Sequence, residues 1–190
     1  MHTVDFPLTA LMSVEGVLAN GFTCELASVG TEGFVEIDAA LESDVALRSA
    51  YCQFGGDVVR VSIDGFQANL LANRAFARRV RRAVRARVFV TEQNQLCNLR
   101  HTVAERLARW MLVTQERLGQ SQVHVTHDAL AAVLGSRRPS ITVASASLEA
   151  SGAIERRRGE IVIRDGARLA ASTCECYALC QGAIAESLSP

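Results

Sequence analysis

The chain has 190 residues, of which 49% are hydrophobic, and its 20 basic residues, all arginine, balance 20 acidic ones. This hydrophobic content excludes general disorder, and the length allows one large domain or two small ones. The charge is uneven, because residues 1–66 hold ten acids and two arginines, whereas residues 67–120 hold eleven arginines and three acids. Arginine makes bidentate contacts with phosphates and carboxylates, so the basic middle is compatible with an anionic partner.

The sequence carries no targeting or membrane signal that we can identify. No run approaches the roughly 20 consecutive apolar residues that span a bilayer, and the first residues lack the basic and apolar regions of a signal peptide. We therefore expect a cytoplasmic protein. Its cysteines lie in ordinary apolar patterns, which favours reduced, mostly buried thiols over disulfides; they are Cys24, Cys52, Cys97, Cys174, Cys176 and Cys180.

The pattern of residues 1–66 predicts antiparallel β-strands. Asn20-Gly21 is a strong hairpin signal. After it, Phe22, Cys24 and Leu26 alternate with Thr23, Glu25 and Ala27, as in a half-buried strand. A second alternating run has apolar residues at Val59, Val61 and Ile63. These strands are too few to close a barrel.

Residues 67–100 change to a helical period. Phe76, Val80, Val84 and Val88 recur every four residues, with arginines on the other faces. This predicts one long helix over residues 75–100 with a narrow apolar seam. The seam has two possible partners, a second subunit related by a two-fold axis or the β-strands of the same chain.

The last segment, residues 101–190, predicts a helix-turn-helix. A first helix starts at a capping box formed by Thr102 and Glu105, and its predicted buried face is Leu107, Trp110, Met111, Thr114 and Leu118. Thr126 can cap a short helix that ends at Gly135. A second short helix begins within residues 136–139, where Pro139 is tolerated in the first turn, and its predicted inner face is Ile141, Ala144, Ser145 and Leu148.

Two apolar runs after this helix, Ala153-Ile154 and residues 161–163, flank an arginine-rich turn and predict a hairpin, the wing of a winged helix. Residues on the second helix would meet base edges or phosphates in the major groove, and the wing would hold the neighbouring backbone. The alternative is a winged helix that binds proteins and whose arginines form a solvated face. The predicted DNA-contacting residues are Arg137, Arg138, Ser140, Thr142, Val143, Arg156, Arg157 and Arg158.

Three stretches resemble the bacterial Crp/Fnr family of transcription regulators: CNLRHTVAERLARWML, THDALAAVLGSRRPSITVASASLEASGAIERRRGEIVIRD and ARLAASTCECY. They cover most of residues 97–177, and the front agrees through VGTEGFVEI. The resemblance implies an α+β fold with a partial antiparallel β-roll of the cyclic-nucleotide-binding type in residues 1–66. It further implies a long dimerisation helix within residues 67–100 and a winged helix-turn-helix in residues 101–190.

The resemblance also implies partners and residue roles. A homodimer would bind a palindromic operator in double-stranded DNA, and RNA polymerase is a candidate partner. Arg138 sits where the family places an arginine that contacts guanine, and Ser140 sits at a phosphate-contacting position. Pro139 and Val143 replace the family's glutamate and second arginine, so the operator should differ from the best-known consensus.

For an effector, Glu36 and Arg48, with the adjacent Ser49, loosely resemble the ribose- and phosphate-binding pair of the cyclic-nucleotide-binding members. Val35 replaces the usual glycine, the spacing is longer, and the front is shorter than in the family. These departures favour two surface charges in a degenerate sensor domain, and we expect no cofactor.

The cysteines near the C-terminus suggest a metal or redox site, but helical geometry argues against it. Residues two apart on a helix point about 200° apart, so one ion would not easily bind both Cys174 and Cys176. Cys176 and Cys180 share a face, although Leu169 and Tyr177 indicate a helix that faces the core. Buried thiols are the favoured interpretation, and no metal site is predicted.

Other chemistry is sparse. His101, His124 and His127 are too separated from cysteine or carboxylate partners to predict a convincing site. No Ser/His/Asp set or phosphate-binding glycine loop stands out, which predicts a protein that is not an enzyme. Two alternatives to a self-sufficient regulator stay open, a shortened interaction module that pairs with full-length relatives, and a thiol- or metal-responsive regulator.

Overall fold

The computed structural model describes residues 2–43 and 45–189. Its contacts divide the chain into two compact units. The first unit comprises Met1–Val17, Leu26–Gln93 and Leu179–Pro190, and the second comprises Leu18–Glu25 and Asn94–Ala178. The division into segments 1–66, 67–100 and 101–190 stays a prediction. No helix in the described part of the chain is long and apolar enough to cross a membrane.

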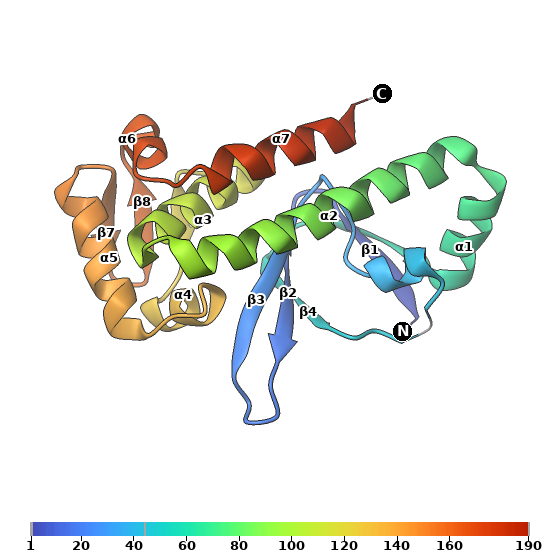
Figure 1. Ribbon diagram of the computed structural model, residues 1–190, viewed down its shortest axis with the longest axis horizontal. Coiled ribbons are helices and arrows are strands. Elements are labelled where there is room, and N and C mark those ends of the chain that lie inside the picture. The colour runs from blue at the N-terminus through green and yellow to red at the C-terminus, as the bar shows by residue number, and fades with distance from the viewer. Residues whose placement is uncertain (1, 44, 190) are drawn as a thin grey trace. The chain divides into compact units, whose positions relative to one another are not determined.

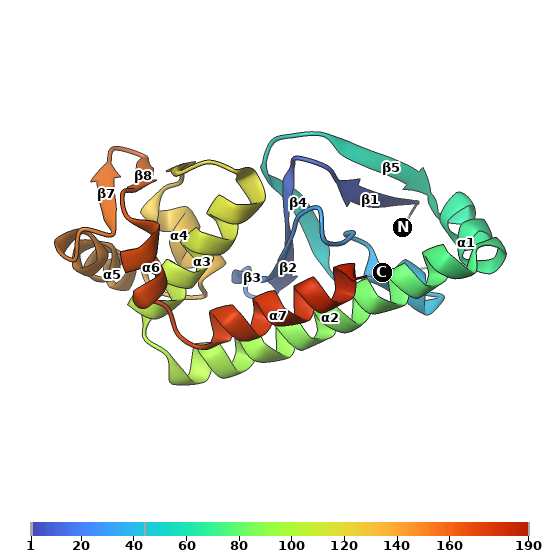
Figure 2. The same ribbon diagram turned by 90° about the horizontal axis from the view of Figure 1, so that it is seen from above.

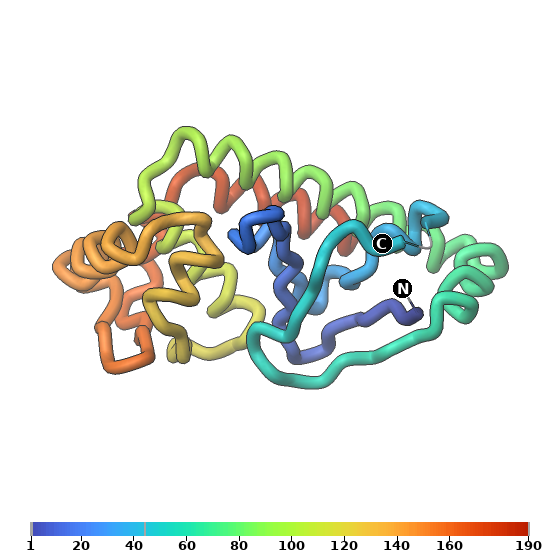
Figure 3. Tube along the Cα trace, turned by 90° about the horizontal axis from the view of Figure 1, so that it is seen from below, coloured from blue at the N-terminus to red at the C-terminus, as the bar shows by residue number. Residues whose placement is uncertain are grey.

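Antiparallel strands form the front of the chain, as predicted. One pair joins β1 to β5, with Thr3 opposite Ser62, and the chain trace shows the two strands side by side (Figure 3). A second sheet has the order β3-β2-β4. The strands are β1 (Thr3–Pro7), β2 (Leu11–Val17), β3 (Thr23–Val29), β4 (Ser49–Phe54) and β5 (Val58–Ser62).

The predicted turn at Asn20-Gly21 joins β2 to β3. Gly21 has a φ of 83°, which glycine adopts without the steric cost that a Cβ would bring. The predicted buried face of β3 is wrong, because Phe22 is 47% exposed whereas Ala27 and Val29 are buried. An alternation with a period of two distinguishes the two faces of a strand but does not say which face is buried. Phe22 lies beside the turn of the hairpin, where its side chain stays exposed.

The core of the first unit is aromatic and includes the start of the long helix. Phe66 is 1% exposed, and its ring lies 5.6 Å from that of Phe34 and 5.7 Å from that of Phe76. Val80 is buried in the same cluster and Val84 packs against it. The helices here are η1 (Ile37–Leu41), α1 (Ile63–Ala72) and α2 (Arg74–Arg100).

The apolar seam of α2 therefore has two different surroundings. Its first three members, Phe76, Val80 and Val84, pack against the β-strands of the same chain. Val88, one helical turn after Val84, is 46% exposed, so the β-strands no longer bury the seam at this position. The helix itself matches the predicted range, starting one residue earlier.

Arginines of α2 hold the C-terminal end of α7 (Cys176–Leu188). Arg79 and Arg82 donate to the backbone carbonyls of residues 187–189, and Arg85 forms an ion pair with Glu186 at 2.7 Å. The two helices run antiparallel here, as Figure 2 shows. Cationic side chains at a helix C-terminus satisfy carbonyls that lack intrahelical partners and complement the helix dipole.

The second unit combines helices with a small antiparallel sheet of order β6-β8-β7. Its largest fully buried side chains include Leu107, Met111, Leu130, Ile141 and Ile161, so both helices and strands supply the core. Figure 1 shows α3, α4 and α5 packed together, with the β7–β8 hairpin beside α5. The elements are α3 (Val103–Leu118), β6 (Gln122–His124), α4 (His127–Val133), α5 (Arg138–Ala150), β7 (Ile154–Arg157), β8 (Glu160–Ile163) and α6 (Gly166–Ala171).

The capping box predicted for α3 is present. The backbone N–H and the hydroxyl of Thr102 each donate to Glu105 Oε2 at 2.7 Å, and the Glu105 N–H donates to Thr102 Oγ1 at 3.3 Å. These bonds hold the pKa of the Glu105 carboxyl below its usual range. The predicted buried face is confirmed at four positions, Leu107, Trp110, Met111 and Thr114, whereas Leu118 is half-buried.

We predict that Thr102→Ala lowers the free energy of unfolding by about 0.5–2 kcal/mol, because the first turn of α3 loses its cap. Since the folded-state pKa of Glu105 is depressed, its stabilisation is present at neutral pH and is lost as the pH falls through that depressed value, so the deficit should shrink in acid. Urea titrations followed by Trp110 fluorescence measure this. Ser147→Ala, at an exposed site on α5, is the control, and equal stability of the two variants would contradict the role of the cap.

Candidate nucleic-acid interface

The helix-turn-helix consists of α4, a tight turn and α5. Thr126 caps α4, since its hydroxyl accepts a hydrogen bond from the Ala129 N–H at 3.1 Å. Gly135 follows the end of α4 with a φ of 54°, in the left-handed region that glycine favours. Arg137 is the N-cap of α5 and Pro139 lies in its first turn. These features confirm the predicted turn.

The two faces of α5 are separated as the sequence predicts. Ile141, Ala144, Ser145 and Leu148 are buried, and the Ser145 hydroxyl is satisfied by the Ile141 carbonyl at 2.8 Å. The outward face carries polar side chains and also Val143, which is 71% exposed. Of the predicted contact residues on this helix, Arg137, Arg138, Thr142 and Val143 are exposed and Ser140 is partly buried.

Two of these outward residues contact α4. Arg138 Nε lies 3.5 Å from Asp128 Oδ1, and both side chains are about two-thirds exposed, at 66% and 69%. Thr142 Oγ1 lies 3.0 Å from His127 Nδ1. An exposed ion pair contributes little to stability, so Arg138 can exchange Asp128 for another anion at small cost. Sequence reasoning missed both neighbours, although each lies in the first turn of the preceding helix.

The three wing arginines have different surroundings. Arg156 is held by Glu149 of α5, to which it donates from its backbone N–H at 2.9 Å, from Nε at 2.8 Å and from Nη2 at 2.6 Å. Arg157 pairs with Glu155 at 2.9 Å. Arg158 is exposed at the turn between β7 and β8 and has no hydrogen bond or ion pair to any described residue. The wing is thus fixed to α5 through Arg156, and Arg158 is its available cation.

A hollow of about 320 Å³ lies between the start of α4, the start of α5 and the wing. Arg138, Arg156 and Arg157 line it together with Asp128 and Glu160. The structure therefore brings helix and wing arginines, which are far apart in sequence, to one concave surface.

Comparison with known proteins identifies this unit. Residues 105–172 match the Crp-like helix-turn-helix domain. Residues 105–172 therefore form a Crp-like helix-turn-helix domain. No curated protein sequence matches the chain significantly.

Solved structures of transcription regulators share the fold of this chain. FixK2 from Bradyrhizobium japonicum superposes with a TM-score of 0.76 at 17% identity, covering 91% of this chain and 88% of that one. The CRP-family transcriptional regulator TTHB099 from Thermus thermophilus gives 0.74 at 18% identity, with coverages of 90% and 87%. At such identities the likeness shows the shared fold.

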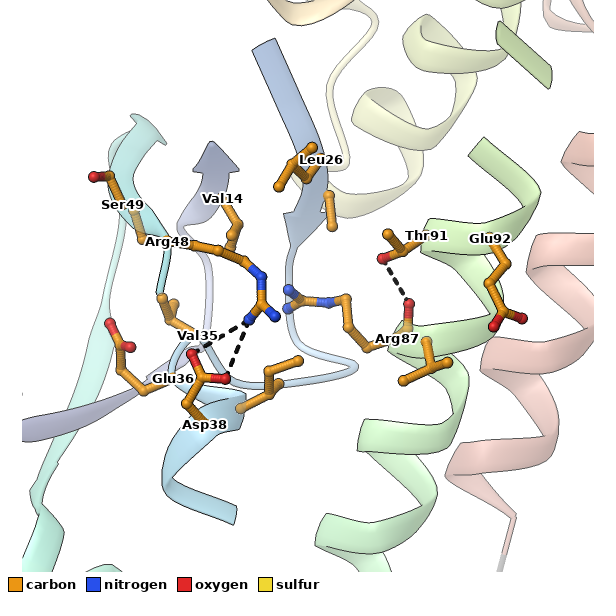
Figure 4. A pocket seen from close by; sticks show the side chains of 14 residues that line it. Val14, Leu26, Val35, Glu36, Asp38, Arg48, Ser49, Arg87, Thr91 and Glu92 are labelled. Carbon is orange, nitrogen blue, oxygen red and sulfur yellow. Dashed lines mark hydrogen bonds and ion pairs between the residues drawn. The ribbon is translucent and has the colours of Figure 1, made fainter. Parts of the chain in front are cut away.

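The three predicted effector residues lie around one pocket of the first unit, with a volume of about 160 Å³ (Figure 4). Their side chains do not converge. Arg48 donates to both carboxylate oxygens of Asp38 at 3.3 Å, and its guanidinium points toward Arg87, whereas Glu36 and Ser49 point away. The role of Glu36, Arg48 and Ser49 in binding an effector stays a prediction.

Electrostatics in this pocket involve residues that sequence reasoning missed. Burial, and then the negative charges of Asp38 and Asp5, raise the pKa of the Glu36 carboxyl. Asp38 is 7% exposed, and the guanidinium of Arg87 donates to the Phe34 carbonyl at 3.2 Å. Asp38 follows Glu36 by two residues, and no local sequence pattern predicts that it is buried.

Three cysteines of the second unit lie close together, although the helical spacing of Cys174 and Cys176 predicts that they point apart. Cys97, Cys174 and Cys176 are buried, and their sulfurs with a ring nitrogen of His101 all lie within 4.8 Å of one another. Cys174 lies in the turn before α7, which begins at Cys176, so the argument that residues two apart on a helix diverge does not apply. The fold therefore brings His101 together with cysteines from two segments that are distant in the sequence.

The expectation of mostly buried thiols holds for four of the six cysteines, since Cys180 is buried as well, whereas Cys52 is exposed and Cys24 is intermediate. Burial raises the pKa of the Cys97 thiol to about 12, and the nearby Arg109 cation opposes this shift. Burial also raises the pKa of Cys174. Without a bound cation, these thiols are therefore protonated at neutral pH.

We predict that cyclic AMP and cyclic GMP do not bind this pocket at micromolar concentration. A cyclic phosphate would have to displace the Asp38 carboxylate from Arg48, and that carboxylate would repel the phosphate. Titration calorimetry with both nucleotides measures this. Micromolar binding that is abolished by Arg48→Ala would contradict the prediction.

Proposed function

We propose that the protein is a sequence-specific DNA-binding transcription regulator that acts as a homodimer on a palindromic operator. The observation that carries the proposal is the exposed face of α5, which starts with Arg137 and Arg138 and lies beside a wing whose Arg158 is exposed. Both basic positions belong to the unit that has the Crp-like helix-turn-helix domain. A winged helix approaches DNA with these two elements.

The recognition helix in this proposal is α5. Arg138 is 66% exposed and loosely held, so it can turn to the O6 and N7 acceptors of guanine. Ser140 is placed one residue after the proline in the first turn, near the N-terminus of the helix, where amides favour a phosphate. Val143 offers an apolar contact for a thymine methyl group. Pro139 and Val143 should give an operator that differs from the family's best-known consensus.

The wing contributes affinity without sequence preference. Arg158 is the available cation and would contact a phosphate. Arg156 acts through Glu149 by fixing the wing to α5, so that the two basic positions keep one spacing. Contact with RNA polymerase stays an expectation drawn from the family resemblance.

The homodimer would form along the second half of α2. Val88, Phe89, Leu96 and Leu99 are 46%, 37%, 55% and 80% exposed. Val88 and Leu99 are eleven residues apart, which is about three helical turns, so they share a face. Large apolar side chains gathered on one helix face mark an interaction surface. The alternative occupant of this face is a full-length relative, as in the shortened interaction module.

We predict that Arg138→Ala reduces affinity for the selected operator by about 1–3 kcal/mol, a loss of roughly 5- to 150-fold, and relaxes specificity at one base pair of each half-site. Selection from a random duplex library, followed by sequencing, identifies the operator and compares the variants. Arg158→Ala is the matched control, because it should weaken binding to all sequences about equally. Equal losses on operator and random DNA for Arg138→Ala would contradict the assigned role.

Replacement of Leu99 by aspartate should convert the homodimer to a monomer, because a charge on the paired apolar face would lose its solvation without gaining a partner. Analytical sedimentation measures the mass. Leu71→Asp is the control, since Leu71 is 88% exposed and lies on α1, away from this face. A wild-type chain that sediments as a monomer would contradict the homodimer and favour a heterologous partner.

A further inference from the structure

Four potential metal ligands come together in the second unit from two segments that are far apart in the chain. Cys97 lies in the last turn of α2, and the His101 N–H donates to the Cys97 carbonyl at 3.0 Å, so the helical spacing continues to the histidine. Residues four apart in a helix share a face. The turn before α7 supplies Cys174, and the first residue of α7 is Cys176.

Two distances within this group are close to those between the ligands of one tetrahedral ion. Cys97 Sγ lies 3.6 Å from Cys174 Sγ, and Cys176 Sγ lies 3.5 Å from His101 Nδ1. Zinc bonds of about 2.3 Å to sulfur and about 2.0–2.1 Å to nitrogen give tetrahedral edges of about 3.8 Å between sulfurs and about 3.6 Å between sulfur and nitrogen. In a [4Fe–4S] cluster each cysteine binds a different iron, so the cysteine sulfurs lie farther apart than Cys97 Sγ and Cys174 Sγ do here.

The surroundings also suit a bound cation. His101 presents Nδ1 to Cys176, while its Nε2 lies 3.3 Å from Glu175 Oε2. Zinc-bound histidines commonly donate their second ring N–H to a carboxylate, which fixes the tautomer and orients the ring.

Two arginines of α3 supply compensating charge. Arg106 is 8% exposed and interacts electrostatically with Cys97 and Cys174, and Arg109 interacts with Cys97. Arg106 forms no ion pair with a carboxylate in residues 2–43 or 45–189. Zinc with three thiolates and a neutral histidine carries one net negative charge, which would serve as a counterion for a buried guanidinium.

We propose that Cys97, His101, Cys174 and Cys176 form a structural zinc site. Four protein ligands fill a tetrahedron, so the site is closed and leaves no position for a substrate. Binding replaces the three thiol protons, which pass to solvent. Two ligands lie before the matched domain, residues 105–172, and two lie after it. A bound ion would therefore join the two ends of this domain and reduce the conformational entropy of the unfolded chain between them. No ligand lies in α5 or the wing, so the site and the DNA-binding proposal can be tested separately.

Metal analysis of the full chain, expressed with zinc and purified under reducing conditions without chelator, tests the site. We expect about one zinc per chain in the wild type and a several-fold loss in Cys174→Ser. Cys180→Ser is the matched control, because Cys180 is also buried, 5% exposed, yet lies outside the group. Zinc that is retained equally in Cys174→Ser and Cys180→Ser would overturn the proposal.

Two measurements cover the case in which Cys174→Ser fails to fold. Cobalt(II) added to wild-type protein should give the intense visible absorption of a tetrahedral thiolate site. Glu175→Gln changes an exposed residue and should weaken zinc affinity by about 10- to 100-fold while Trp110 fluorescence stays native. A wild-type protein that holds neither zinc nor tetrahedral cobalt, or that holds iron with sulfide instead, would contradict the zinc site.

Discussion

The burial of one face of α5 is the constraint on which the rest of the interface depends. Ile141, Ala144, Ser145 and Leu148 pack inward, and α3 and α4 cover them. Burial of each large apolar side chain stabilises the fold by roughly 1.5–3 kcal/mol, so one orientation of the helix about its own axis is strongly preferred. That rotation alone decides that Arg138, Thr142 and Val143 are outward. Core packing therefore decides which side chains α5 presents on its exposed face.

Arginine has three uses in this chain, and the partners of each side chain distinguish them. Arg79, Arg82 and Arg85 satisfy the end of α7, and Arg156 ties the wing to Glu149. Arg106 is buried and donates a hydrogen bond to the Leu134 carbonyl. In the winged helix, the exposed Arg137, the loosely held Arg138 and the exposed Arg158 are left for a nucleic acid. The number of basic residues alone would therefore point to the wrong part of the molecule. The basic middle is mostly α2, whose Arg79, Arg82 and Arg85 hold the end of α7.

Local signals explain why the sequence predicts the winged helix well. The Thr102 and Thr126 caps, Gly135 and the arginine-rich turn each act within a few residues, and the structure has all of them where expected. The buried face of β3 was missed because alternation cannot tell which side a second layer covers. The Asp38–Arg48 pair and the cysteine group were missed for a related reason: Cys97 and Cys174 are 77 residues apart, and only the tertiary fold brings them together.

The arginine contacts at the end of α7 also constrain how this protein can be engineered. The carbonyls of residues 187–189 accept hydrogen bonds from Arg79 and Arg82, so they need to stay accessible to these guanidinium groups. An affinity tag or fluorescent fusion joined directly after them would crowd those groups and continue the helix past its natural stop. A fusion partner is better placed at the other terminus, or after a flexible glycine-rich spacer that lets α7 end where it does.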